Sequence, residues 1–101
     1  MIEITYDRAH FSVTAKGHAR AGEPGHDIVC AGVSALLYAL KYRAAAAHRA
    51  QTDMETAGFG FVRCYPQPGE EALCREMLET GMEGLRAIAK SYQDYVTVRE
   101  V

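Results

Sequence analysis

The chain has 101 residues, which predicts a single domain spanning residues 1–101 with a modest hydrophobic core. Its hydrophobic share of 49% and charged share of 24% are typical of a soluble globular protein, and a net charge of −2 disfavours a general nucleic-acid binder. The N-terminus lacks the basic and apolar regions of a signal peptide, and the longest nearly apolar run, residues 28–40, is too short to cross a bilayer.

Seven segments have the periodicity of a strand or a helix. In chain order they are strands over 2–6 and 10–16, a helix from 28 to about 47, strands over 51–56 and 59–65, a helix from 70 to about 92, and a strand over 95–101. Asp27 is a good N-cap for the first helix. The order β-β-α-β-β-α-β predicts a two-layer α+β single domain with a largely antiparallel sheet and two helices.

The first predicted helix is apolar nearly all round in its first turns. A helix of this kind is usually covered on more than one side. We expect the sheet to cover one side and either the second helix or a partner subunit to cover the other, which hints at a homodimer. The three cysteines, Cys30, Cys64 and Cys74, form no Cys-x-x-Cys pair, and their odd number favours a reduced cytoplasmic protein over a disulfide scaffold.

The most informative pair of residues is His18 and Cys30. A glycine-rich loop joins a histidine at the end of a predicted strand to a cysteine in the first turn of a predicted helix. The unpaired N–H groups and the dipole of a helix start favour a thiolate, and a nearby imidazole supplies a base. This is the minimum equipment of a cysteine hydrolase. Ser34 lies one helical turn beyond Cys30 on the same face, where it could orient a group or simply pack.

Plainer interpretations of these residues stay open. A cysteine in an apolar helix is usually a core residue, and Asp27 could be a simple cap. A zinc site built from His18, His26 and Cys30 has the right ligand types but matches no usual zinc spacing. The remaining histidines and cysteines are weaker candidates: His10 for an edge or surface position, His48 for a helix C-terminus, and Cys64 and Cys74 for packing.

The run G-H-A at residues 17–19, followed by G-x-D-I-V-C-A-x-V-S-A-L at residues 25–36, resembles the signature of the bacterial ribosomal-processing cysteine protease (Prp) family. The resemblance implies that His18 and Cys30 form a catalytic dyad and that Asp27 and Ser34 lie around the active site. It implies that Gly17, Ala19, Gly22 and Gly25 belong to a loop that folds over the substrate. Two positions depart from the usual pattern: Gly32 replaces a frequent alanine, and His26 is a second histidine near Cys30.

The family implies a cysteine endopeptidase that removes a short N-terminal extension from the twenty-seventh protein of the large ribosomal subunit, after an aromatic-rich segment. It also implies homodimers. From the residues themselves we expect no cofactor, no metal, no membrane and no direct nucleic-acid partner. Backbone N–H groups at the helix start are candidate oxyanion donors. Two other functions stay open: a non-catalytic peptide-binding or ribosome-assembly module of the same fold, and a thiol-dependent enzyme of another kind.

Overall fold

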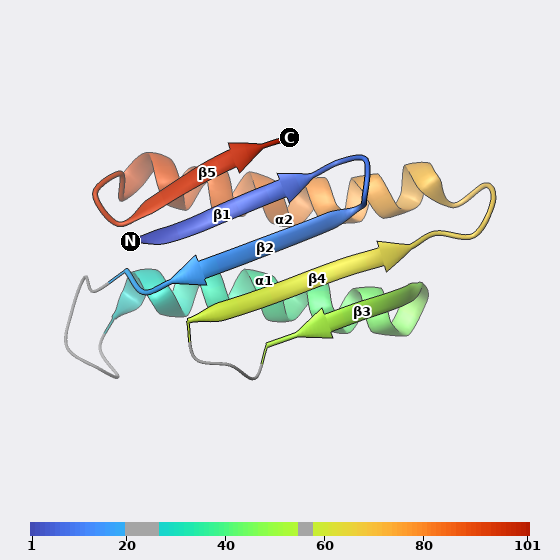
Figure 1. Cartoon of the computed structure of the whole chain (residues 1–101), viewed down its shortest axis with the longest axis horizontal. Helices are drawn as coiled ribbons and strands as arrows, with labels where there is room; N and C mark the ends of the chain where they lie inside the picture. Colours follow the sequence, from blue (N-terminus) through green and yellow to red (C-terminus); the bar gives the residue numbers. More distant parts are fainter. Residues whose placement is uncertain (20–26, 55–57) are drawn as a thin grey trace.

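The computed structural model describes residues 1–19, 27–54 and 58–101, which form a five-stranded sheet with two helices packed on one face (Figure 1). The elements are β1 (Ile2–Asp7), β2 (Ser12–Gly17), α1 (Ile28–Ala47), β3 (Arg49–Asp53), β4 (Phe59–Tyr65), α2 (Glu71–Ser91) and β5 (Val96–Glu100). The predicted two-layer α+β architecture and element order are confirmed.

The strand order across the sheet is β3-β4-β2-β1-β5. The pairs β1–β2, β2–β4 and β3–β4 are antiparallel, as expected for a largely antiparallel sheet. The edge strand β5 instead runs parallel to β1, with Ile2 opposite Val96. Parallel neighbours cannot be joined by a tight turn, and here the whole of the intervening chain connects them.

Two strands, β2 and β3, begin two residues away from their predicted starts, and β5 begins one residue later than predicted, at Val96. β2 begins at Ser12 rather than at residue 10, because Phe11 has a left-handed φ of +51° that ends the turn. His10 therefore lies in the turn, where its ring is 2.8 Å from an oxygen of Asp7. β3 begins at Arg49, directly after the α1 C-cap, and ends at Asp53 rather than at residue 56, while residues 55–57 lie outside the described chain.

The core lies between the sheet and the helices. α1 contributes buried Val29, Val33, Leu37, Leu40 and Ala44, and α2 contributes Cys74, Leu78, Gly81, Met82 and Leu85. The two helices meet closely because the glycines of α2 leave room for leucines of α1. A Cβ at Gly81 would lie 2.7 Å from Leu40 Cδ1, and a Cβ at Gly84 would lie 2.8 Å from Leu36 Cδ1. The second helix is therefore one of the covers that the apolar first helix needs.

α1 has the length and apolar composition that could also suit a membrane span. This differs from the expectation based on the shorter run of residues 28–40, because the helix continues to Ala47. The core helix of a soluble protein satisfies the same test. The buried row described above packs this helix on the sheet, so its apolar character has a structural explanation within the fold.

An ion cluster ties α2 to the edge strand β5. Arg86 donates to Glu100 at 2.7 Å and 3.2 Å, to Glu79 at 3.0 Å and to Glu83 at 3.2 Å. Arg8, in the turn after β1, also pairs with Glu100. The planar guanidinium of Arg86 suits this bidentate contact with one carboxylate.

Candidate active site

Cys30 stands in the first turn of α1, as the sequence predicts. Asp27 has an extended backbone, and its Oδ1 accepts hydrogen bonds from the N–H groups of Val29 and Cys30, both at 3.0 Å. Asp27 is therefore the N-cap that sets the start of the helix. The cap places the Cys30 side chain, which is half-buried, at the end of α1 nearest to β2.

The cap also limits which backbone donors at the helix start can bind an oxyanion. The N–H groups of Val29 and Cys30 bind the Asp27 side chain, and the N–H of Ala31 donates to the Asp27 carbonyl at 3.1 Å. These three donors already have partners, so they are not available to an oxyanion. The physical reason is the predicted N-cap, because the Asp27 carboxylate accepts hydrogen bonds from two of the N–H groups that we expected to bind the oxyanion.

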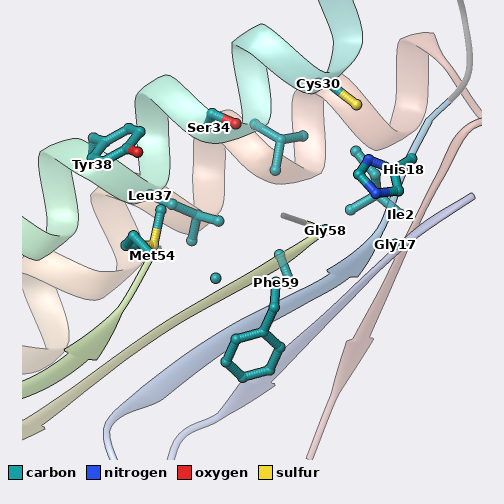
Figure 2. A pocket seen from close by; sticks show the side chains of 13 residues that line it. Ile2, Gly17, His18, Cys30, Ser34, Leu37, Tyr38, Met54, Gly58 and Phe59 are labelled. Carbon is teal, nitrogen blue, oxygen red and sulfur yellow. The ribbon is translucent and has the colours of Figure 1, made fainter. Parts of the chain in front are cut away.

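His18 directly follows β2 at the same end of the molecule. Its strand is held on both sides, by β1 and by β4, and the N–H of Gly17 donates to the carbonyl of Gly58 at 2.7 Å. Figure 2 shows the His18 imidazole and the Cys30 sulfur pointing toward one another from β2 and α1. His18 is exposed, so substrate and solvent can reach the space between the imidazole and the sulfur.

The backbone after His18 contacts the cysteine directly. The N–H of Ala19 donates to Cys30 Sγ at 3.3 Å, and Ala19 is buried. Within the described residues no hydrogen bond joins the His18 ring to the sulfur itself. Catalytic hydrogen bonds are often long in free enzymes and shorten when substrate binds.

A pocket of about 290 Å³ extends from His18 and Cys30 along α1. Gly17 and Ser34 line it, so the structure places Ser34 on the same side of the helix as Cys30 (Figure 2). Beyond them the walls are mainly apolar or aromatic. The walls include Ile2, Ala15, Val33, Leu37, Tyr38, Met54, Phe59 and Gly60. The pocket is thus an apolar groove with a thiol and an imidazole at one end.

Sequence reasoning singled out the thiol and the imidazole at one end of this pocket but missed much of its wall. Met54, Gly58 and Phe59 come from segments that carry no catalytic motif, and only strand pairing brings β4 beside β2. Tyr38 lies on α1 itself, one helical turn beyond Ser34. Gly58 has a positive φ of +76°. The sequence indicates this only weakly, through a glycine just before a strand that begins with an aromatic residue. Of the other predicted residues, Gly22, Gly25 and His26 lie outside the described residues, as does most of the predicted loop 17–26.

Among the described residues, the other cysteines and histidines do not line this pocket. Cys64 and Cys74 are buried, as predicted, and burial raises the pKa of Cys64 to about 11 and raises that of Cys74. His48 caps the C-terminus of α1. Residues 1–19, 27–54 and 58–101 bring no three metal-ligating side chains together, and the predicted zinc ligand His26 is not among them.

Comparisons with known proteins identify the family of the chain. The family model of the cysteine protease Prp matches residues 1–97. The essential ribosomal processing protease Prp from S. aureus is similar in two solved structures. With a covalently linked product peptide it has 26% identity, full coverage of both chains and a TM-score of 0.86. The structure with a substrate peptide has 25% sequence identity, covers 99% of this chain and 97% of that chain, and has a TM-score of 0.76.

A third structure, SMU.848 from Streptococcus mutans, has 25% identity, covers 99% of this chain and 91% of its own, and has a TM-score of 0.69. A comparison with curated proteins gave no match. The family model covers nearly all of the chain. The chain belongs to the cysteine protease Prp family.

Proposed function

We propose that this cysteine protease removes the short N-terminal extension of the twenty-seventh protein of the large ribosomal subunit, with Cys30 as nucleophile and His18 as base. The observation that carries this proposal is the placement of the two motif residues at one end of one pocket, from β2 and α1. The structures of S. aureus Prp with a substrate peptide and with a covalently linked product peptide support a peptide substrate.

In the proposed reaction His18 takes the thiol proton, and Cys30 Sγ attacks the scissile carbonyl carbon. The tetrahedral intermediate collapses when the C–N bond breaks and the imidazolium gives its proton to the leaving amine. A water molecule, deprotonated by His18, then attacks the thioester. The new C–O bond displaces the sulfur, the thiol regains a proton, and the peptide leaves with a carboxylate.

The oxyanion of each intermediate needs a donor close to the sulfur. We assign this role to the N–H of Ala19, which lies 3.3 Å from Cys30 Sγ. When the sulfur carries an acyl group, the carbonyl oxygen is bonded to the carbon next to it and comes within reach of this N–H. The assignment replaces the helix-start donors, which bind Asp27.

The apolar part of the pocket supports an apolar or aromatic substrate side chain next to the scissile bond. Leu37 and Met54 contribute side chains to its walls, and Tyr38 stands at its far end, whereas the Phe59 ring points away from the pocket (Figure 2). Burial of a large apolar side chain in such a groove is favourable by about 1.5–3 kcal/mol, which suffices to orient a short peptide. This matches the aromatic-rich extension that the family resemblance implies.

The test incubates the protein with the N-terminally extended ribosomal protein and reads the new N-terminus by mass spectrometry. Cys30→Ala and His18→Ala should each abolish cleavage, while His10→Ala is the matched control, because His10 is also an exposed histidine but lies in the turn after β1. Binding of the peptide by wild type without cleavage would instead indicate a peptide-binding module. Full activity of the His18 variant would refute the dyad.

We also propose that the protein acts as a cytoplasmic homodimer. Ile28 and Tyr42 of α1 remain exposed at 68% and 65%, so the sheet and α2 leave part of the apolar helix uncovered. The three free cysteines suit a reducing compartment. Light scattering during gel filtration should give twice the monomer mass, and Ile28→Glu should reduce it. A monomeric wild type at micromolar concentration would contradict the dimer.

A further inference from the structure

Gly58 lies directly before β4 and next to the end of β2. Its φ of +76° is a backbone conformation that suits glycine, and its carbonyl accepts the N–H of Gly17 at 2.7 Å. This hydrogen bond joins Gly58 to the residue immediately before His18. The backbone of Gly58 thus holds the strand end from which the imidazole projects.

The His18 ring occupies the space that a side chain at Gly58 would need. A Cβ built on Gly58 would lie 2.7 Å from Nε2, 3.2 Å from Cε1 and 3.3 Å from Cδ2 of His18. Ordinary van der Waals contact begins at 3.4 Å, so the ring would have to withdraw by about 0.7 Å. His18 is exposed, so the ring can move without unfolding the protein.

From this contact we infer that Gly58 is a positioning residue for His18: the absence of a side chain at Gly58 lets the imidazole lie against the backbone and face Cys30. Figure 2 shows the ring between the Cys30 sulfur and Gly58. A side chain at Gly58 would move the ring away from its place without touching the pocket's nucleophile. This inference rests on the proposed role of His18 as base.

The experiment compares Gly58→Ala with Gly69→Ala. Gly69 has a φ of +91° and nothing within 4 Å of a built Cβ, so the control carries the same kind of backbone strain with no clash. Both variants should lose similar stability. Only Gly58→Ala should lose activity, with kcat lower by about tenfold or more and KM within about twofold, because a misplaced base costs turnover more than binding.

A second readout separates a positioning role from a structural one. The rate of Cys30 alkylation by iodoacetamide is measured against pH for wild type, both glycine variants and His18→Ala. The pH profile of the alkylation rate in Gly58→Ala should shift toward the profile of His18→Ala, whereas the profile of Gly69→Ala should match that of wild type. Equal activity of the two glycine variants, or an unchanged alkylation profile in an inactive Gly58→Ala, would overturn the inference.

Two further measurements keep the inference testable if Gly58→Ala does not fold. Asparagine tolerates the left-handed region, so Gly58→Asn adds a Cβ with less backbone strain and should also lose turnover. In the wild type, NMR should show contacts between the Hα protons of Gly58 and the His18 ring, and their absence would overturn the inference. A fully active His18→Ala would refute the proposed dyad itself, which is a separate outcome.

Discussion

The cap at the start of α1 is the feature whose energetic role is easiest to measure. Asp27 Oδ1 accepts two backbone hydrogen bonds at 3.0 Å, from Val29 and Cys30. Asp27→Ala removes both acceptor contacts and leaves two N–H groups in a partly buried helix start. Loss of an N-cap costs about 0.5–2 kcal/mol, and the partial burial places the expected loss at about 1–2 kcal/mol.

Asp27→Asn separates the cap from its charge. Asparagine caps helices about as well as aspartate, so this variant should keep the two capping hydrogen bonds and lose less stability than Asp27→Ala, including a charge–dipole part of about 0.3–1 kcal/mol. For a domain of this size, 1 kcal/mol corresponds to a shift in Tm of about 4–8 °C. Thermal unfolding of wild type, Asp27→Asn and Asp27→Ala at pH 7 measures the shift in Tm, and urea unfolding measures the change in the free energy of unfolding.

The order of stability should therefore be wild type, then Asp27→Asn, then Asp27→Ala. If the alanine variant were as stable as wild type, the hydrogen bonds to Val29 and Cys30 would not stabilise the helix start. If the asparagine variant lost as much as alanine, the carboxylate charge, and not the capping geometry, would be the main contribution of Asp27.

Two more predictions concern reactivity and pH. Cys30 should react with iodoacetamide at neutral pH before Cys64 and Cys74, because it is half-exposed whereas burial raises the pKa of the other two thiols, that of Cys64 to about 11. Peptide mapping by mass spectrometry checks the order, and earlier labelling of either buried cysteine in the folded protein would contradict it. The Arg86 guanidinium holds the pKa of Glu100 below its ordinary 4.5, so the folded state binds this proton more weakly than the unfolded state. The resulting stability is present above that pH and is lost as the pH falls through the lower folded value. Glu100→Gln should thus be less stable than wild type at pH 7 and similar to it at strongly acidic pH, and a constant difference across the titration would contradict the linkage.

The helices and their limits follow closely from local sequence. Asp27 caps the first helix where predicted, and the second helix differs from its predicted limits, 70 and about 92, by one residue at each end. These features depend on capping, periodicity and composition, which act over a few residues. The start of β2 was less predictable, because the left-handed Phe11 ends the turn at a residue whose alternation also suits a strand.

Sequence by itself determined the order of elements, the two-layer class, the family and the pair of residues that we propose as the catalytic dyad. Those properties depend on short-range patterns and on one long motif. Only the tertiary structure decided the parallel pairing of β5 with β1, the glycine contacts between α1 and α2, and the placement of Gly58 against His18. Each of these joins residues far apart along the chain, and a contact of that kind depends on strand order and helix packing, which no local pattern of residues specifies.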